Sequence, residues 1–514
     1  MGVLEFFLVY FCVMFVRKKI NKSGVVSIQV IDKSSGRYKV LKTIGSSSKG
    51  HELERLIAQG EQYIRDLSGI QEFDFSNYDE IYSQVLTSIT SHKLVGIDLV
   101  LGKLFDEIGF NSVADELFKD LVLYRLVYPK SKLKTTEYLY RFAQKSYSED
   151  EVYRYMDKLY DTQKEIVQNI SYEHTLKILP KGIQIVFYDV TTVYFETDYE
   201  DDLRKTGFSK EGKHQNPQIV LGLLVSEGGY PLAYDIFEGK QYEGHTMLPI
   251  INGFRKKYNL EKLVVVADSG LLSNDNINVL IANQYEFILG ARIKNEKQEI
   301  KDRIQALTLN NGESKTIKKG NLNLIVTYSE DRAKKDKYNR EKGLNRLEKS
   351  LKSGKLTKTN INNRGYNKFL EMDGEIHLKL NQDKINADEK WDGLKGYLTN
   401  SKMSKTEILD NYKQLWIIEK AFRITKTDLK IRPIFHYKRR RIEAHICLNF
   451  VAYKVYKELE RQLKVKKAGL SPEKVIEILQ SIYEIVAIAP NNSVYKKLIL
   501  LNEEQFKIKK LFDF

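Results

Sequence analysis

Two aspartates of this chain follow buried strands, where an acidic side chain can meet a ligand. Asp189 stands in VFYDVTTVYFE and Asp268 stands in VVVADSGLLS, each at the end of a continuous apolar run. Ligands of open α/β sheets bind beyond the carboxyl ends of the strands, so an acid at that edge is a candidate for chemistry. Each aspartate taken alone could equally be a helix cap or a turn residue.

A third acid, Glu419, lies in YKQLWIIEKAFRITK, a segment with helical periodicity. Spacings of three, four and seven residues return to the same helical face. One such face is polar and consists of Tyr412, Glu419, Arg423 and Lys426. The adjacent face is apolar, is expected to pack on a sheet, and consists of Leu415, Ile418, Phe422 and Leu429. The alternative for Glu419 is a surface ion pair with Arg423 at i, i+4.

Three carboxylates meeting at one sheet edge would suit phosphoryl transfer by two divalent cations. Oxygen ligands favour Mg²⁺ or Mn²⁺, which keep several waters and take further ligands from phosphate. Two such ions can activate the attacking oxygen and stabilise the leaving one. The sequence does not favour nucleophilic catalysis or nucleotide hydrolysis, because it has no GxSxG elbow and no Walker loop. Its two cysteines, Cys12 and Cys447, fit no metal-ligand spacing.

The charge balance favours a polyanionic partner. The 514 residues include 83 Lys plus Arg against 68 Asp plus Glu, which gives a net charge of +15. A surplus of that size favours nucleic acid, although a basic protein of another class has the same balance. The length implies three or more structural units. The low cysteine content indicates a reducing compartment, and the cytoplasm is the expected location.

The first sixteen residues, MGVLEFFLVYFCVMFV, are strongly apolar. They lack the basic start and the small-residue cleavage site of a signal peptide. They are also shorter than the roughly 20 residues of a membrane span. We interpret residues 1–16 as an apolar leader or a misassigned start upstream of Met14, and we expect no membrane partner. A membrane anchor is the alternative interpretation.

Five apolar segments predict the strands of a mixed α/β sheet. They are IQIVFYDV, QIVLGLLVS, YPLAYDIFEG, LVVVADSG and YEFILGARI. The first three follow one another directly, and the last two alternate with helical segments. A polar insertion at 294–388 separates the fifth strand from the helix with Glu419, and it contains a hairpin-like part, GNLNLIVTYS. The role of this insertion stays open.

Other patterns flank this core on both sides. Residues 17–49 predict short strands, and residues 50–180 predict a largely helical region. Within the latter, PKSKLKTT is a basic helix start that suits either a phosphate or ordinary capping. A further helix is expected over 438–462, and a helical tail over 463–514.

The order Asp189, Asp268, Glu419 resembles the DDE transposases of the insertion-sequence-4 superfamily. That superfamily has an insertion between the second Asp and the Glu, where this chain has residues 294–388. Several phrases are similar to its branch with long, lysine-rich members, namely YDVTTVYFE, VVADSGLL, DGLKGYLTN and LKIRPIFHYKRRRIEAHICL. The similarity covers roughly residues 15–460.

The superfamily's signature is Tyr, two residues, Arg, three residues, Glu, six residues, Lys. This chain has Tyr412, Glu419 and Lys426 at those spacings. Leu415 stands where the Arg is expected, which puts one DNA contact in doubt. Arg423 is a candidate substitute.

The resemblance implies an α/β fold with a ribonuclease-H-like mixed sheet core, interrupted by the insertion before the Glu-bearing helix. Asp189, Asp268 and Glu419 would be catalytic and would hold two Mg²⁺ (or Mn²⁺) ions. The expected partners are DNA, as terminal inverted repeats and as target, and a second copy in a homodimer. The expected organisation is a leader at 1–16, short strands at 17–49, DNA-end recognition at 50–180, core parts at 181–293 and 389–462, the insertion at 294–388, and the tail at 463–514.

The resemblance also implies DNA contacts around the cut. Tyr412 and Lys426 would contact phosphate, although the alternative is a solvated helix face. Further candidates for neutralising phosphate are Arg423, Lys430, Arg432, Lys438, Arg439, Arg440 and Arg441. A charge run such as KRRR can equally be a solvated helix start.

Several other polar residues compete for a role. Rivals for metal binding crowd after the first core strand, although an acidic loop is the simpler interpretation: Glu196, Asp198, Asp201 and Asp202. His436 and His445 could assist at the site, but a structural, hydrogen-bonded histidine is the better interpretation. Two other functions stay open, a catalytically inactive DNA-binding protein derived from a transposase and a plain nuclease.

Overall fold

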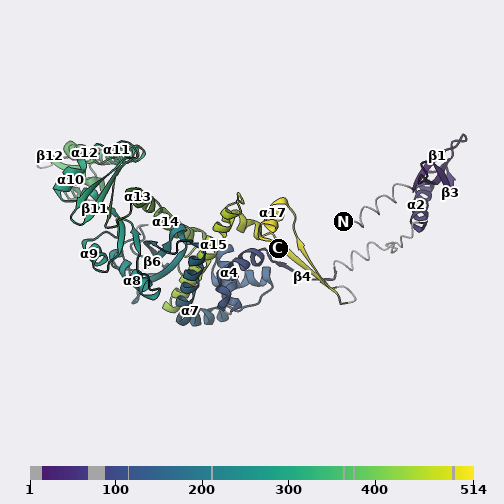
Figure 1. Cartoon of the computed structure of the whole chain (residues 1–514), viewed down its shortest axis with the longest axis horizontal. Coiled ribbons are helices and arrows are strands. Elements are labelled where there is room, and N and C mark those ends of the chain that lie inside the picture. Colours follow the sequence, from purple (N-terminus) through teal and green to yellow (C-terminus); the bar gives the residue numbers. More distant parts are fainter. Residues whose placement is uncertain are drawn as a thin grey trace. The chain divides into compact units, whose positions relative to one another are not determined.

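The structure is a computed structural model of the chain, and it describes residues 14–67, 87–113, 115–209, 212–362, 365–373, 377–488 and 492–514 (Figure 1). The expected leader at 1–16 therefore lies outside these residues except for 14–16. The chain divides into two compact units, one of 1–90 with 486–495 and one of 91–485 with 496–514. Among the described residues, no helix is long and apolar enough to cross a membrane.

The first unit contains a small sheet covered by one helix. The strands β1 (Met14–Ile20), β2 (Val26–Asp32) and β3 (Lys39–Ser47) are antiparallel in the order β1-β2-β3. Strands β2 and β3 enclose the predicted turn, so the short strands expected here are present. Helix α2 (Gly50–Leu67) packs on this sheet, and Gly60 on the helix lies against Val16.

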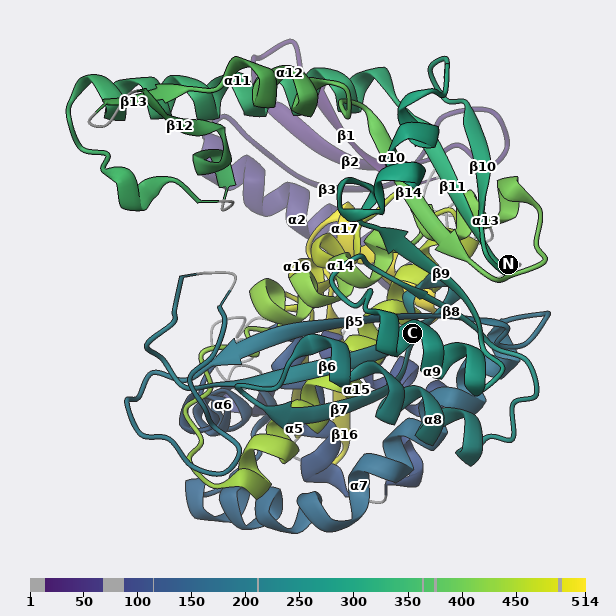
Figure 2. The same ribbon diagram turned by 90° about the vertical axis from the view of Figure 1, so that its left-hand side faces the viewer.

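The second unit is built on one eight-stranded mixed sheet, in the order β10-β11-β14-β9-β8-β5-β6-β7. Its core strands are β5 (Ile185–Tyr194), β6 (Gln218–Ser226), β7 (Pro231–Glu238), β8 (Val264–Ala267) and β9 (Glu286–Ala291). The first three form antiparallel pairs and lie side by side in Figure 2. Strands β5, β8 and β9 are parallel neighbours. The predicted α/β class and all five predicted core strands are confirmed.

Helices cover both faces of this sheet because its strands are apolar on both sides. On β5, Phe187 and Val193 belong to one buried cluster, whereas Val186 and Tyr188 belong to the other. The second cluster contains side chains of α8 (Met247–Lys257) and α9 (Asn274–Ala282). The first contains side chains of α14 (Trp416–Arg423) and α15 (Arg439–Val465).

The region before the core is mainly helical, and it packs on α15. Its helices are α4 (Lys103–Ile108), α5 (Glu116–Val127), α6 (Lys132–Tyr138) and α7 (Glu149–Ile178). It also contains a strand, β4 (Ile89–Leu94), which the helical prediction for 50–180 did not include. Ser131 caps α6 by accepting a hydrogen bond from the backbone N–H of Lys134 at 3.2 Å, so the capping expected of the basic helix start is present.

The insertion contributes to the main sheet. Its hairpin of β10 (Ser314–Lys319) and β11 (Leu322–Tyr328) pairs with β14 (Leu394–Thr399), which pairs with β9. The remaining elements are α10 (Gln298–Gln305), α11 (Glu330–Lys352), β12 (Leu370–Asp373), β13 (His377–Leu380) and α12 (Gln382–Glu389). The predicted hairpin is therefore present, and it extends the core.

The expectation of a helical tail over 463–514 is wrong in part. After α15 come α16 (Pro472–Leu479), two strands β15 (Tyr483–Ile488) and β16 (Val494–Ile499), and α17 (Glu503–Phe512). The strands form a sheet in the order β16-β15-β4. Their β-branched, alternating sequence favours strands once a partner is available. That partner, β4, is nearly 400 residues away, which periodicity cannot reveal.

Candidate active site

Two of the expected acids lie side by side on the sheet. Tyr188 of β5 pairs with Ala267 of β8, so the next residues, Asp189 and Asp268, stand at the same level of parallel strands. Such strands are about 4.8 Å apart. Side chains alternate along a strand, and Asp189 shares the face of Phe187, which is the face that α14 covers. Both aspartates are half-buried.

Each of these aspartates is oriented by its own backbone. Asp189 accepts a hydrogen bond through Oδ1 from the N–H of Val190 at 2.8 Å. Asp268 accepts one through Oδ1 from the N–H of Gly270, also at 2.8 Å. The predicted strand-end position is thus correct for Asp268, which directly follows β8. Asp189 instead lies within β5, which continues to Tyr194.

A glycine of the next strand lies at the same level of the sheet as the two aspartates. Ala267 pairs with Leu289, so Asp268 is followed across the sheet by Gly290 of β9, which pairs with Tyr397 of β14. The hydroxyl of Tyr412 lies 2.4 Å from the place that a Cβ at Gly290 would occupy. Only a residue without a side chain leaves room for the phenol there. Tyr412 is 7% exposed, with its ring 4.6 Å from that of Tyr397.

Glu419 comes from a separate short helix. The expected long helix is wrong, because it is broken into α13 (Lys405–Lys413) and α14 (Trp416–Arg423) by a turn at 414–415. In this turn Leu415 N–H bonds to the carbonyl of Tyr412 in a tight i→i−3 pattern. The expected stripe is therefore divided, since Tyr412 is buried while Glu419 and Arg423 are exposed.

The apolar face of this segment is confirmed. Leu415, Ile418, Phe422 and Leu429 are all buried. They lie on the side of this segment that packs on β5 and on the turn at Glu227–Gly229, so that the opposite side of α14 carries Glu419. After Arg423 the helix widens into a π-type turn over Ile424–Asp428, which contains the half-buried Lys426.

The three acids share an electrostatic neighbourhood centred on Tyr412. Burial raises the pKa of Tyr412 above its ordinary value, and the charges of Asp268, Glu419 and Asp189 raise that pKa further. The sheet register places Asp189 and Asp268 side by side, whereas Glu419 lies on the exposed side of α14, and its part in the site remains a prediction.

Two cations that the sequence analysis did not select lie at the same place. Lys395 of β14 extends over the ring of Tyr412, with Nζ 4.7 Å from the ring centre. Burial and the charge of Arg332 lower the pKa of Lys395, whereas Glu419 opposes that shift. Arg292, which follows β9, donates to the carbonyl of Gly270 at 3.3 Å, beside the Asp268 turn.

The donor set suits a hard divalent cation. Carboxylate oxygens are the ligands of Mg²⁺, which is commonly held by one or two carboxylates and completed by water and phosphate. The pair Asp189 and Asp268 meets that requirement. Among the described residues, no group of three or more His, Cys, Asp or Glu side chains is close enough to hold a metal ion, so Glu419 does not complete such a group in this structure.

Residues 180–454, more than half of the chain, match the family described as Transposase DDE domain. The chain belongs to the DDE transposase family. The transposase is also similar to the piggyBac transposase synaptic complex with hairpin DNA, with 10% identity, 75% of this chain and 76% of that chain covered, and a TM-score of 0.39.

A second solved structure, the Mos1 transposase paired-end complex with left transposon end, is 12% identical to the transposase. The similarity covers 36% of this chain and 56% of that chain, with a TM-score of 0.16. No curated protein matches the transposase.

The basic run before α15 is largely occupied by internal ion pairs. Arg440 lies 3.0 Å from Asp157 of α7, and Arg441 donates two hydrogen bonds to the same carboxylate at 2.8 and 3.0 Å. Arg439 bonds to Glu443 at 2.9 Å. Lys438 is exposed at the start of the helix. The arginines thus connect helices of the transposase, and their contacts with DNA remain a prediction.

The other expected DNA contacts lie in different surroundings. Arg423 and Lys430 are exposed, and Arg432 is half-buried over the ring of Tyr194 at 5.8 Å. Tyr412 is buried against Gly290 and Tyr397, and its contact with phosphate remains a prediction.

The acidic loop after β5 has a structural explanation. Asp201 accepts bonds from the N–H groups of Leu203 and Arg204 and from the guanidinium of Arg204. Asp202 lies 3.7 Å from Arg439. Glu196 and Asp198 are exposed.

His445 is the structural histidine that was expected. It is 4% exposed, lies within 3.0 Å of the Arg125 guanidinium, and its Nε2 is 3.2 Å from the carbonyl of Ile431.

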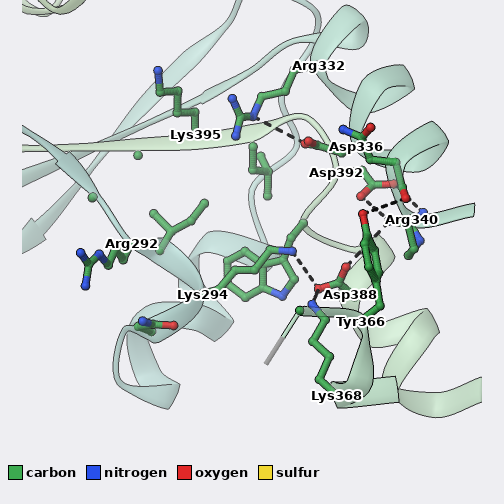
Figure 3. Close-up of a pocket in the computed structure, with 18 residues that line it drawn as sticks. Arg292, Lys294, Arg332, Asp336, Arg340, Tyr366, Lys368, Asp388, Asp392 and Lys395 are labelled. Carbon is green, nitrogen blue, oxygen red and sulfur yellow. Dashed lines mark hydrogen bonds and ion pairs between the residues drawn. The ribbon is translucent and has the colours of Figure 1, made fainter. Parts of the chain in front are cut away.

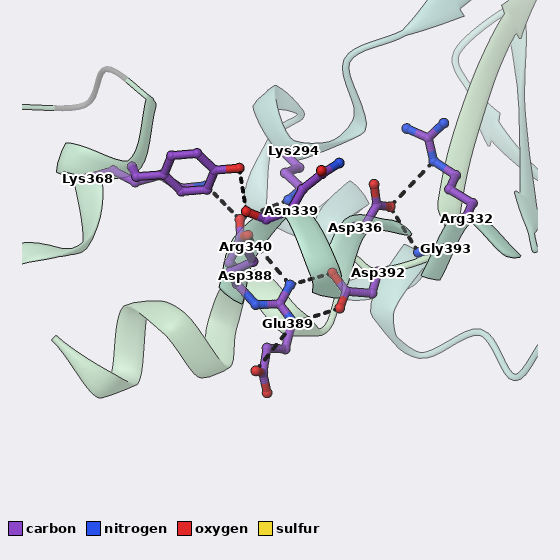
Figure 4. Close-up of polar contacts among 11 residues, drawn as sticks. Lys294, Arg332, Asp336, Asn339, Arg340, Lys368, Asp388, Glu389, Asp392 and Gly393 are labelled. Carbon is purple, nitrogen blue, oxygen red and sulfur yellow. Dashed lines mark hydrogen bonds and ion pairs between the residues drawn. The ribbon is translucent and has the colours of Figure 1, made fainter. Parts of the chain in front are cut away.

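A cavity of about 640 Å³ lies between the insertion and the edge of the site (Figure 3). We call it the insertion cavity, and its charged lining consists of Arg292, Lys294, Arg332, Asp336, Arg340, Lys368, Asp388, Asp392 and Lys395. Figure 4 shows that most of these charges are paired. Arg340 bonds to Asp392 at 2.6 and 2.7 Å, and both Lys294 and Lys368 bond to Asp388.

Sequence reasoning missed Gly290, Lys395 and Tyr397. The phrase DGLKGYLTN contains two of them and was noted only for its resemblance. Their role depends on which strands pair and in which register, because β9 and β14 are separated by the whole insertion. A lysine within a predicted strand was the one local signal.

Proposed function

We propose that this protein is a transposase of an insertion sequence that cuts DNA at terminal inverted repeats and joins the freed end to target DNA. The observation that carries the proposal is the placement of Asp189 and Asp268 side by side at neighbouring parallel strands, with Glu419 on the helix that packs on β5. Membership of the DDE transposase family supports the reaction class. The strand order of the core, three antiparallel strands followed by parallel ones, supports a ribonuclease-H-like sheet. The insertion supports placement in the insertion-sequence-4 superfamily.

Asp189 and Asp268 would hold divalent cations, Mg²⁺ or Mn²⁺, and Glu419 would complete the donor set. Bound there, two such ions would supply activation of the attacking oxygen and stabilisation of the leaving one. The chain's own part is to fix the two aspartates at one level of the sheet and to keep Tyr412 behind them. Gly290 leaves the space that the phenol occupies, and the N–H groups of Val190 and Gly270 orient the two carboxylates.

Lys395 and the basic residues around the site would hold the DNA. Lys395 lies beside Glu419 and can offset negative charge that gathers on a phosphate during the reaction. Arg423, Lys426, Lys430 and Lys438 would neutralise phosphates further along the strand. Action as a homodimer on DNA in the cytoplasm belongs to the same proposal.

The test is strand cleavage and joining on duplexes that carry the inverted repeats flanking the gene, with Mg²⁺ or Mn²⁺ present. Wild type is compared with Asp189→Asn, Asp268→Asn and Glu419→Gln, which keep side-chain shape and remove charge. Glu196→Gln and Asp198→Asn are matched controls, because both are exposed acids shortly after β5. We expect background activity in the first three and wild-type activity in the controls.

Each other outcome identifies which part of the proposal is wrong. Activity that survives in one of the three variants removes that acid from the site. Loss in a control variant instead would move the metal site to the acidic loop. Binding of the repeats without cleavage, in wild type and all variants, would indicate a catalytically inactive DNA-binding protein. Cleavage without joining would indicate a plain nuclease.

A further inference from the structure

A second cavity of about 240 Å³ lies where the helical region meets the loop before α15. It is lined by Arg125, Lys130, Lys132, Lys430, Arg432 and His436, with smaller contributions from uncharged neighbours. Its volume is far above the roughly 10–15 Å³ that one water needs. No carboxylate is among the lining residues in the part of the chain that the structure describes. We call this cavity the cationic pocket.

Two of its cations are deeply buried. Lys132 is 5% exposed and Arg125 is 6% exposed. The guanidinium of Arg125 bonds to the carbonyl of Lys130 and to His445, but its Nε has no hydrogen-bond partner within the described residues. No described residue bonds to the ammonium group of Lys132 either. Buried charges are normally paired, so these two cations suit an anionic ligand.

The electrostatics of the pocket agree with its geometry. Burial and the charge of Arg125 hold the pKa of Lys132 well below its ordinary value. Burial lowers the pKa of Arg125 to about 10. Burial, followed by the charges of Lys132, Arg125 and Arg441, lowers the pKa of His436 to about 3. Lys132 and His436 thus have like charge beside them, which an anion would relieve.

We propose that the cationic pocket binds a backbone phosphate of DNA, with Lys132 and Arg125 Nε as its buried donors. Lys430 and Arg432 stand nearer the solvent, where a strand that enters the pocket would pass. Phosphate is the fitting ligand, because its several oxygens accept from more than one donor at once. The DNA identity of this phosphate rests on the proposed function.

The pocket lies within reach of the same DNA strand as the carboxylates. Ile434, beside the pocket, donates its N–H to the carbonyl of Tyr194 at the end of β5. Tyr194 is five residues beyond Asp189 on that strand, which corresponds to roughly 17 Å at about 3.3 Å per residue. One duplex turn spans about 34–36 Å. The pocket would therefore hold a phosphate less than a turn from the one at Asp189.

The first experiment measures thermal unfolding of the full chain against inorganic phosphate, with chloride replaced to keep ionic strength constant. A chelator excludes any contribution of metal at the carboxylates. Lys132→Met removes the buried charge, and Lys134→Met is the matched control, an exposed lysine on the same helix that pairs with Glu137. Lys132→Gln repeats the test with a polar side chain in case the Met variant does not fold.

We expect phosphate to raise the Tm of wild type and of Lys134→Met but not of Lys132→Met. Without phosphate, Lys132→Met should melt about 2 °C above wild type, because an unpaired buried charge has been removed. A Tm of Lys132→Met below wild type, together with an unchanged response to phosphate, would overturn the proposal. So would a wild type whose Tm does not respond to phosphate.

The second experiment separates DNA from free phosphate. Binding of a duplex oligonucleotide is measured against salt concentration, again with chelator. Loss of one phosphate contact should make the slope of log K against log salt shallower by about 0.9 in Lys132→Met and leave it unchanged in Lys134→Met. Equal slopes in all three proteins, with the Tm effects intact, would mean that the pocket takes free phosphate and would overturn its role in DNA binding. Neither readout requires cleavage, so both are independent of the acid variants.

Discussion

The insertion cavity and the cationic pocket are both lined by cations, but they differ in whether carboxylates pair with those cations. In the insertion cavity, Arg340 bonds to Asp392, and Lys294 with Lys368 bonds to Asp388. In the cationic pocket, Lys132 and Arg125 are about as deeply buried as Arg340, but no carboxylate is among the described residues that line the pocket. A count of basic residues would rank the first cavity higher, whereas the pairing of charges favours the second as an anion site.

The strongest test of this contrast is removal of a paired cation. Arg340→Met leaves Asp392, whose side chain is only 17% exposed, without its guanidinium partner, and it also removes the bond to Glu389. Breaking a buried pair by removing one member costs about 3–5 kcal/mol. We expect the free energy of unfolding, measured with urea, to fall by that amount.

The exposed Arg346 on the same helix supplies the control for this measurement. Arg346→Met should change the free energy of unfolding by less than about 0.5 kcal/mol. If Arg340→Met were equally mild, the insertion cavity would not depend on charge pairing, and the contrast would fail.

Lys395 should be the exception within the insertion cavity, because its anionic neighbour is the site acid Glu419. Lys395→Met is expected to lower the rate of strand cleavage about tenfold to hundredfold. Lys294→Met, which removes a cation bonded to Asp388, should leave that rate unchanged. Equal losses in the two variants would show a general effect of positive charge in the cavity.

The cationic pocket should show a pH dependence that phosphate suppresses. The pKa of His436 is about 3 in the folded protein against 6.5 ordinarily, owing to burial and to Lys132, Arg125 and Arg441. As the pH falls, the unfolded chain therefore binds a proton on this histidine before the folded protein does. The contribution of His436 to the free energy of unfolding is complete above pH 6.5 and is lost as the pH falls toward 3. The free energy of unfolding should fall by about 1 kcal/mol per pH unit between pH 6 and 4.

His436→Gln should flatten this part of the profile, and phosphate should flatten it in wild type, because a bound anion favours the charged imidazole. The slope that remains in the variant is assigned to His445 and His174, whose pKa values burial also lowers. A profile unchanged by His436→Gln would remove this histidine from the pocket's electrostatics.

The smallest effect is expected at Lys368. Asp388 bonds to both Lys368 and Lys294, so one cation remains when the other is lost. Lys368→Met should lower the free energy of unfolding by less than about 1 kcal/mol. The double variant with Lys294→Met should lose more than the sum of the single variants, which a double-mutant cycle measures.

The sequence was sufficient to predict the core strands and the apolar face of the helix that carries Glu419, whereas the role of the three acids remains a prediction. Continuous apolar runs before Asp189 and Asp268 predict buried strands, and burial of Leu415, Ile418 and Phe422 was evident from helical spacing. These features depend on local patterns, which a single sequence contains.

Features that depend on distant partners were not predictable. The pairing of Arg440 and Arg441 with Asp157 joins residues almost 300 positions apart. The turn at 414–415 divides a continuous helical pattern, because the packing of α14 on β5 outweighs local propensity. Likewise, the fit of Tyr412 over Gly290 follows only from the register of β9 against its neighbours.

The placement of the acids on different elements divides the site into a fixed part and a separately carried part. Asp189 is held within a central strand of an eight-stranded sheet and Asp268 directly follows another strand of it, so the backbone amide of Asp189 should exchange with solvent only when that sheet opens. Glu419 is carried by an eight-residue helix whose first residue follows a turn without a side-chain cap and whose end runs into a wider coil. A DNA strand seated across the sheet would therefore meet two carboxylates already in place, and the final assembly of the site would be governed by the motion of one short helix.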